Sequence, residues 1–226
     1  MIRLLVDASN KEIGIGLFNN KKCLFEKYSD TDKSYNRQIM PMIKEAVDIV
    51  KMDINDIDLF GATLGPGSFT GIRVGIAVMR ALSHGLHKNF YGVSVIDILL
   101  KSVNVNMNKV VLMDAGRNEF YFSYYDIKEP DKIINYKIYD EDKIIKLIKK
   151  TDAVVFLQND LVVNQLVKNH IKNDNIITLP HIDIKVFNDI IEKDNINKNN
   201  ILCNNFLPVY IRMPDAEKIL KKRRKK

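Results

Sequence analysis

Apolar and polar positions follow a fixed order over the first half of the chain. Short apolar runs joined by polar turns occupy residues 2–6, 13–18 and 22–28, and they predict an antiparallel meander of three strands. Helical periodicity follows over residues 34–51, where Pro41 predicts either a kink or a later helix start. Residues 58–64 predict a buried strand, and residues 68–87 predict a second helix.

The second half of the chain repeats this order more loosely. After a strand at 90–93 and a helix capped by Ser94, the pattern predicts strands at 109–113, 119–125, 133–139, 153–157 and 176–179. It predicts helices at 141–150, 161–170 and 184–193. Three strands, a helix and a strand occur twice in this order, which predicts an α/β protein of two related lobes.

Asparagine-rich segments suggest where these parts meet. Residues 104–108 and 195–205 are rich in asparagine and interrupt the periodic pattern of apolar residues. We expect a first lobe over residues 1–104, a second lobe over 105–205, and a return segment over 206–220 that packs on the first lobe. The last six residues, 221–226, are all basic and form the expected disordered tail.

A glycine-rich turn lies between the strand at 58–64 and the helix that follows it. A P-loop would have Lys where Ile72 stands, and five residues rather than four separate Gly65 from Gly71. A Rossmann turn would have Gly where Thr70 stands and an acidic residue after the next strand, which ends at Val93. A structural role stays open beside both motifs, because glycine permits steep turns and close backbone packing. We expect no nucleotide or other cofactor here.

The helix after this turn is apolar over more than half of its circumference. A helix packed on one sheet needs an apolar arc of only about 100°. The excess predicts a second burial surface, against either another subunit or the second lobe. Arg73, Arg80, His84 and His87 form a narrow polar strip that we expect to face solvent. The two histidines have a metal-ligand spacing, but the sequence supplies no third ligand, so we expect no metal and no catalytic residue.

Charge and composition narrow the class of protein. The net charge is +7, but without the last six residues 29 basic side chains face 28 acidic ones, which leaves +1. The tail is either solvated or an arm for RNA phosphates; its possible RNA contacts are Lys221, Lys222, Arg223, Arg224, Lys225 and Lys226. Two cysteines without metal or disulfide spacing, the early Asp7 and the lack of a long apolar run predict a cytoplasmic protein without signal peptide or membrane contact.

The run GPGSFTGIRVG at residues 65–75 resembles the signature of the TsaB (YeaZ-like) family of tRNA threonylcarbamoyladenosine biosynthesis proteins. Other segments agree in the same order: LVDAS at 5–9, GVS at 92–94, DAGRNEFY at 114–121 and PVYIR at 208–212. The resemblance implies a two-lobed actin-like, Hsp70-like fold, with a mixed sheet in each lobe. The structural glycine motif is then Gly65, Gly67, Ser68, Thr70, Gly71 and Gly75.

The resemblance also implies a function without catalysis by this chain. Family members dock and activate the catalytic subunit TsaD, together with the P-loop ATPase TsaE. The assembly transfers threonylcarbamoyl to N6 of the adenosine beside the anticodon of tRNAs that read ANN codons. Family members also form homodimers. The expected partner interface is Tyr35, Ile39, Met42, Ile43, Phe69, Ile72, Ile76, Met79 and Arg80. Two alternatives stay open: an active ATPase or kinase of the actin-like class, and a protein that binds tRNA directly through its tail.

Overall fold

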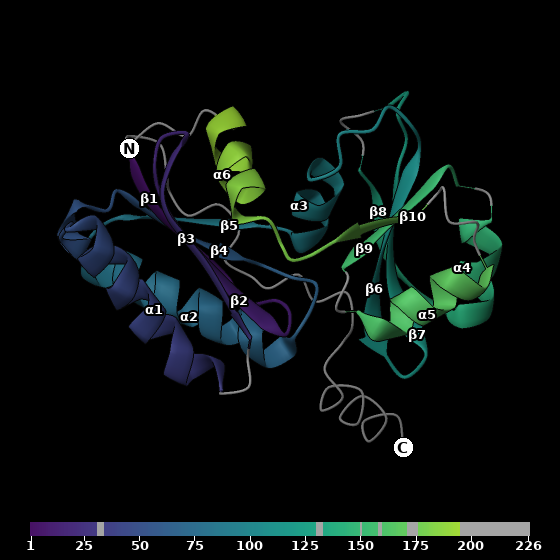
Figure 1. Cartoon of the computed structure of the whole chain (residues 1–226), viewed down its shortest axis with the longest axis horizontal. Helices are drawn as coiled ribbons and strands as arrows, with labels where there is room; N and C mark the ends of the chain where they lie inside the picture. Colours follow the sequence, from purple (N-terminus) through teal and green to yellow (C-terminus); the bar gives the residue numbers. More distant parts are fainter. Residues whose placement is uncertain (31–33, 130–132, 150, 158–159, 171–175, 195–226) are drawn as a thin grey trace, which may run out of the picture.

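The computed structural model describes residues 1–30, 34–129, 133–149, 151–157, 160–170 and 176–194. The expected linker at 195–205, return segment at 206–220 and basic tail at 221–226 lie outside these residues. Within them, no helix is both long enough and apolar enough to cross a membrane. Figure 1 shows two halves, each built on one sheet, with helices on the outside and between them.

The first sheet has the strand order β3-β2-β1-β4-β5. Its strands are β1 (Ile2–Asp7), β2 (Glu12–Asn19), β3 (Lys22–Asp30), β4 (Leu59–Thr63) and β5 (Asn89–Val93). The meander β1–β3 is antiparallel, whereas β4 and β5 join β1 in parallel. The sheet is therefore mixed, as the predicted order of elements requires.

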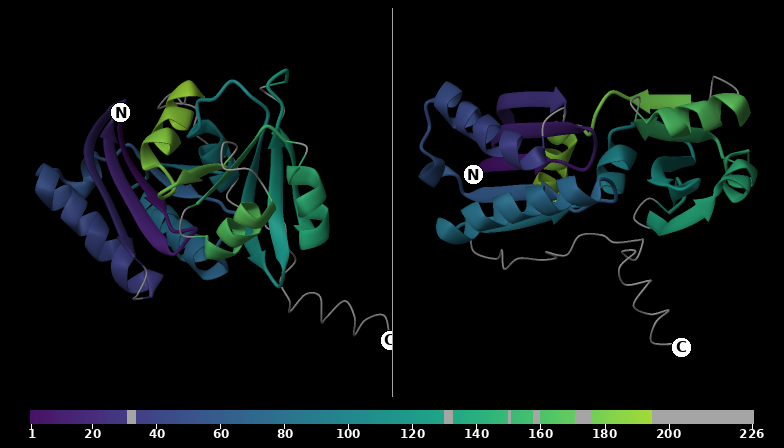
Figure 2. Two further views of the ribbon diagram at one scale, coloured as in Figure 1. Left: turned by 45° about the vertical axis from the view of Figure 1, so that its right-hand side comes forward. Right: turned by 90° about the horizontal axis from the view of Figure 1, so that it is seen from below.

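Helices α1 (Tyr35–Val50) and α2 (Phe69–Gly85) pack on one face of this sheet and on each other (Figure 2). α1 begins at Tyr35 and runs through Pro41, so the expected alternative of a later start is wrong. Pro41 is exposed, which keeps its ring away from the packed face of the helix.

The second sheet has the order β10-β9-β6-β7-β8, which repeats the first when its strands are counted from β6. Its strands are β6 (Lys109–Gly116), β7 (Glu119–Tyr125), β8 (Ile133–Asp140), β9 (Ala153–Leu157) and β10 (Ile176–Leu179). Its helices α4 (Glu141–Ile148) and α5 (Leu161–His170) share one buried apolar cluster with the sheet. The expected α/β fold of two related lobes, each with a mixed sheet, is confirmed, while the exact lobe boundaries stay a prediction.

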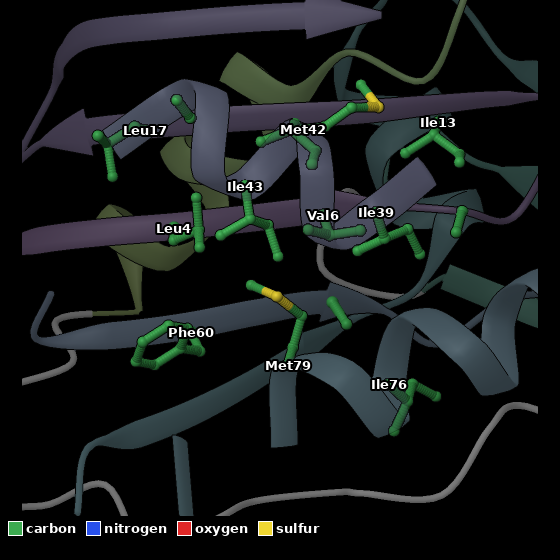
Figure 3. Close-up of a cluster of buried hydrophobic side chains, with 14 of the residues drawn as sticks. Leu4, Val6, Ile13, Leu17, Ile39, Met42, Ile43, Phe60, Ile76 and Met79 are labelled. Carbon is green, nitrogen blue, oxygen red and sulfur yellow. The ribbon is translucent and has the colours of Figure 1, made fainter. Parts of the chain in front are cut away.

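The described residues form three buried apolar clusters. The first lies between the first sheet and helices α1 and α2, and Figure 3 shows Leu4 and Phe60 of the sheet facing Ile43 and Met79 of the helices. The third fills the equivalent place in the second half. The second cluster lies between the two sheets and contains residues from both, for example Leu5 and Val111. The halves therefore share a core, which burial of apolar surface stabilises.

Two helices in this shared core exchange sides. α3 (Val95–Lys101) follows the first sheet in sequence but packs on β6 and β9 of the second. α6 (Ile184–Lys193) comes from the second half but packs on β1, β2 and β5 of the first, and it touches α3 (Figure 1). The range expected for the second lobe thus contains a helix that belongs structurally to the first sheet.

A buried arginine fixes α6 to the first sheet. Arg3 of β1 is 2% exposed, and its Nη1 donates to Glu192 Oε1 at 2.7 Å and to Asn188 Oδ1 at 3.0 Å. Both partners belong to α6. The Asn188 amide also donates to the carbonyl of Asn20 at 2.9 Å. A charge this deeply buried needs its partner, because the guanidinium has lost its hydration.

Replacing Glu192 by Ala should therefore destabilise the protein by about 2–4 kcal/mol, because it leaves Arg3 buried without its carboxylate. Urea unfolding followed by circular dichroism measures the change. Lys44→Ala is the control, since it breaks only the exposed pair between Lys44 and Asp48 on α1 and should cost about 0.5 kcal/mol or less. Equal losses for the two variants would show that the Arg3 contact does not anchor α6.

Candidate functional site

The glycine-rich turn connects the end of β4 to the start of α2. Ser68 caps the helix, because its Oγ accepts from the Gly71 amide at 3.2 Å. The Ser68 amide donates in turn to the carbonyl of Ser9 at 2.7 Å, in the loop after β1. A backbone amide at a helix N-terminus that could bind an anion is thus already used by the protein itself.

Two glycines of this turn lie against the loop after β1. A Cβ atom on Gly67 would lie 2.1 Å from the Ser9 carbonyl oxygen, and the φ angle of this glycine is +150°. A Cβ atom on Gly71 would lie 2.0 Å from the Ala8 carbonyl oxygen. No other residue type fits at such distances from a backbone atom without a shift of the chain. The turn is therefore a place where two backbones meet.

Asp7 holds the loop after β1 in place through hydrogen bonds to its carboxylate. Its Oδ1 accepts from Thr63 Oγ1 at 2.6 Å, from Ser9 Oγ at 2.7 Å and from the Ser9 amide at 3.1 Å. All three residues are buried. Burial raises the pKa of Asp7 above its ordinary value, although these hydrogen bonds act in the opposite direction. The carboxylate thereby joins the end of β1 to the end of β4.

Tyr35 connects the same loop to helix α1. Its hydroxyl donates to the Asn10 carbonyl at 2.8 Å, and its ring carbons lie 2.8 Å from the Cβ position of Gly71. The loop after β1 is thus enclosed by the first residue of α1 and by the first turn of α2. The glycine turn, the loop after β1 and the two helices form one structural unit. Its geometry depends on the lack of a side chain at Gly67 and at Gly71.

The outer face of α2 is a continuous exposed stripe. Its members recur at helical spacing and are exposed, and we call Phe69, Arg73, Ala77, Arg80, Ala81 and His84 the outer stripe of α2. Phe69 is 46% exposed, and the Arg73 guanidinium lies 3.7 Å above the centre of its ring. Two small residues in its middle allow close approach of another helix, and cationic groups surround them.

The structure divides the expected partner residues into two groups. Six of them are buried in the chain's own core: Ile39, Met42, Ile43, Ile72, Ile76 and Met79. Ile76 is only 6% exposed and Met79 is not exposed at all, so neither side chain reaches a partner in this fold. Their burial has a plain physical cause: α1 and α2 pack on each other as well as on the sheet, which accounts for their broad apolar arcs. Phe69 and Arg80 are exposed, and Tyr35 is half-buried.

The expected partner interface does not include Arg73, Ala77, Ala81 and His84. Arg73 and His84 belong to the polar strip that the sequence predicts to face solvent, and both are exposed. Among the described residues, no three His, Cys, Asp or Glu side chains are grouped so that they could hold a metal ion. The possible RNA contacts at residues 221–226 lie outside the described part of the chain.

Comparisons with known proteins agree with this architecture. Residues 29–191 match the family described as TsaD: tRNA N6-adenosine threonylcarbamoyltransferase. A "tRNA threonylcarbamoyladenosine biosynthesis protein TsaB" of Buchnera aphidicola (subsp. Schizaphis graminum) is 28% identical over 127 residues, which cover 55% of this chain and 60% of that protein. A protein of the same description from Buchnera aphidicola (subsp. Baizongia pistaciae) is 26% identical over 220 residues, which cover 92% of this chain and 96% of that protein.

A solved structure agrees in fold. YeaZ from Pseudomonas aeruginosa superimposes with a TM-score of 0.69 at 16% identity, over 92% of this chain and 99% of that one. The aligned part of the chain spans less than two thirds of the first Buchnera relative but nearly all of the second. The match to the TsaD-type family model covers well over half of the sequence, and the relatives at 26% and 28% identity are described as TsaB proteins. The chain therefore belongs to the TsaB/YeaZ family of TsaD-type proteins.

Replacing Gly71 by Ala should destabilise the protein by about 1–3 kcal/mol, because the new methyl group would overlap the Ala8 carbonyl. Helix propensity alone would predict the opposite change in stability, because it favours Ala over Gly. The matched control is Gly85→Ala in the same helix, where no atom lies within 4 Å of the Cβ position; it should be neutral or stabilise by up to about 1 kcal/mol. Urea unfolding of both variants measures the difference. If they unfold at the same urea concentration, the two backbones do not meet as described.

Proposed function

We propose that this member of the TsaB/YeaZ family is a non-catalytic scaffold subunit for the modification of tRNA. In this proposal it docks and activates a TsaD-like catalytic subunit, and a TsaE-like P-loop ATPase joins the assembly. The complex transfers threonylcarbamoyl to N6 of the adenosine next to the anticodon of tRNAs that read ANN codons. The tRNA reaches this chain through the complex, in the cytoplasm. Without its catalytic partner, the chain forms a homodimer through the surface that would otherwise dock that partner.

The observation that carries the proposal is the outer stripe of α2. It combines a large exposed aromatic side chain with two alanines and with Arg73, Arg80 and His84. Aromatic and arginine side chains are enriched in protein interfaces, and small residues let two helices approach closely. A stable contact must bury roughly 1,000 Å² or more, so the proposal requires the exposed side of the neighbouring α1 to take part in it as well.

The core beneath the stripe suits it for docking. Ile72, Ile76 and Met79 anchor α2 on the sheet, while the glycine turn fixes the start of the helix against the loop after β1. A partner that binds the stripe therefore meets a rigid helix, so little conformational entropy is lost on docking. Activation of the partner then follows if docking stabilises its competent conformation.

The geometry of the glycine turn supports a role without catalysis. In a nucleotide site the N-terminus of the helix after the turn faces phosphate oxygens. Here the carbonyl oxygens of Ala8 and Ser9 occupy this side of the turn, and one of them accepts the Ser68 amide. Phosphate would meet these oxygens rather than open amides, which disfavours its binding.

Replacing Ala77 by Glu should weaken binding of a TsaD-like subunit by at least about tenfold, because the new carboxylate would be buried in the interface. Formation of threonylcarbamoyladenosine on tRNA by the reconstituted complex should fall in parallel. The fold should be retained, since Ala77 is exposed. Size-exclusion co-elution and a thermal melt of the free chain measure the two effects.

The matched control is Gln165→Glu, which adds one carboxylate at an exposed position of α5 in the other half. It should leave partner binding and melting temperature unchanged. Co-elution of the Ala77→Glu variant at wild-type strength would refute the assignment of the partner to this face.

Calorimetry of the free chain with ATP and magnesium tests the non-catalytic role. We expect that ATP does not bind with a Kd in the micromolar range. Such a Kd would correspond to a binding free energy of about −8 kcal/mol. Binding of that strength, accompanied by hydrolysis, would favour the alternative of an active ATPase of the actin-like class.

A further inference from the structure

A cavity of about 580 Å³ lies on the side of the protein where α3 and α6 end and β6 begins. Its lining is mixed. Val103, Val105 and Ile127 are apolar and Tyr125 adds an aromatic ring, whereas several other lining residues are polar: Lys101, Asn104, Asn106, Lys109 and Lys193. Its volume lies within the range of about 300 to 1,000 Å³ that is typical of small-molecule sites, and its polar groups suit a charged ligand rather than a purely apolar one. The glycine turn and the outer stripe of α2 contribute nothing to its lining.

A buried lysine lines this cavity. Lys109, the first residue of β6, is only 4% exposed. Its Nζ donates to the Val103 carbonyl at 2.5 Å and lies 4.8 Å from the centre of the Tyr125 ring. No carboxylate of a described residue forms an ion pair with it. Burial lowers the pKa of this ammonium group, which shows the cost of holding a charge there.

The hydrogen-bonding capacity of Lys109 is only partly used within the described chain. An ammonium group has three donor hydrogens. The Val103 carbonyl takes one, and the Tyr125 ring supplies a cation–π contact in a second direction. The described residues therefore leave one donor hydrogen of this cavity-lining lysine unused. An anionic oxygen in the cavity would both accept it and offset the cost of the buried charge.

Two more lysines line the same cavity. Lys101 lies in the last turn of α3, and Lys193 lies in the last turn of α6. Both are exposed, so they can draw an anion from solvent towards the cavity. Since α3 and α6 come from different halves of the chain, the lysines meet only in the folded protein.

We propose that this cavity binds a small organic anion, with a carboxylate or phosphate group on Lys109 and an apolar part against Val103, Val105 and Tyr125. The positive charge and the partly used donor of Lys109 favour an anionic group at one end of the ligand. The apolar wall of the cavity favours an apolar group in the rest of the ligand. A lysine that served only to hold the end of α3 would need no cavity beside it. This site is independent of the proposed scaffold role.

The test uses the full chain and three probes of similar shape: phenyl phosphate, benzoate and the neutral benzamide. Calorimetry should give a Kd below about 1 mM for at least one anion and binding at least about tenfold weaker for benzamide. The two anions distinguish phosphate from carboxylate recognition. Absence of binding for both anions up to about 10 mM would overturn the proposal.

Lys109→Met keeps most of the side-chain volume and removes the charge. It should weaken binding of the preferred anion by at least about tenfold, whereas Lys44→Met, an exposed lysine of α1, should leave it unchanged. Equal affinity of the Lys109→Met variant and the wild type would overturn the proposal. If this variant does not fold, NMR titration of the wild type decides: the amides of Val103, Val105 and Ile127 should shift with the anion, and shifts confined to other residues would contradict the site.

Discussion

The structure depends on the close contact between the glycine turn and the loop after β1. Only hydrogen atoms on Gly67 and Gly71 allow the carbonyls of Ser9 and Ala8 to lie where they do. This contact sets the distance between β1 and the start of α2, and through Tyr35 it also sets the start of α1. The orientation of both helices, and hence the face that they present, follows from it.

The second half of the chain repeats the topology but not this contact. Asp114 lies near the end of β6, in the place that Asp7 has at the end of β1. Asp7 is buried and accepts three hydrogen bonds from Ser9 and Thr63, whereas Asp114 is exposed, and its amide donates to Asp160 at 2.8 Å. The same succession of strands thus supports a closed loop in one half and an exposed one in the other. The two halves therefore share one architecture but differ in this local contact.

The exchange of α3 and α6 explains why the halves act as one body. Each helix covers the sheet of the half to which it does not belong in sequence, and the core between them contains side chains from both sheets. Arg3, Asn188 and Glu192 add a buried polar contact to α6. The same exchange brings together the lysines of the cavity next to Lys109, which no single half could assemble.

The sequence by itself determined the order of helices and strands, the repeat of three strands, a helix and a strand, and the family signature at residues 65–75. Apolar residues recur every two positions in a strand and every 3.6 in a helix, so their spacing reflects local backbone geometry. The glycines mark a turn that side chains would obstruct. Only the tertiary structure decided how much of the apolar arc of α2 is buried within the chain itself. Periodicity shows how much of a helix is apolar but not how many neighbours surround it. The contact with α1 therefore places Ile76 and Met79, two of the expected partner residues, in the core of the chain itself. The burial of Lys109 and the return of α6 to the first sheet were equally beyond the sequence, because both result from contacts between residues far apart in the chain.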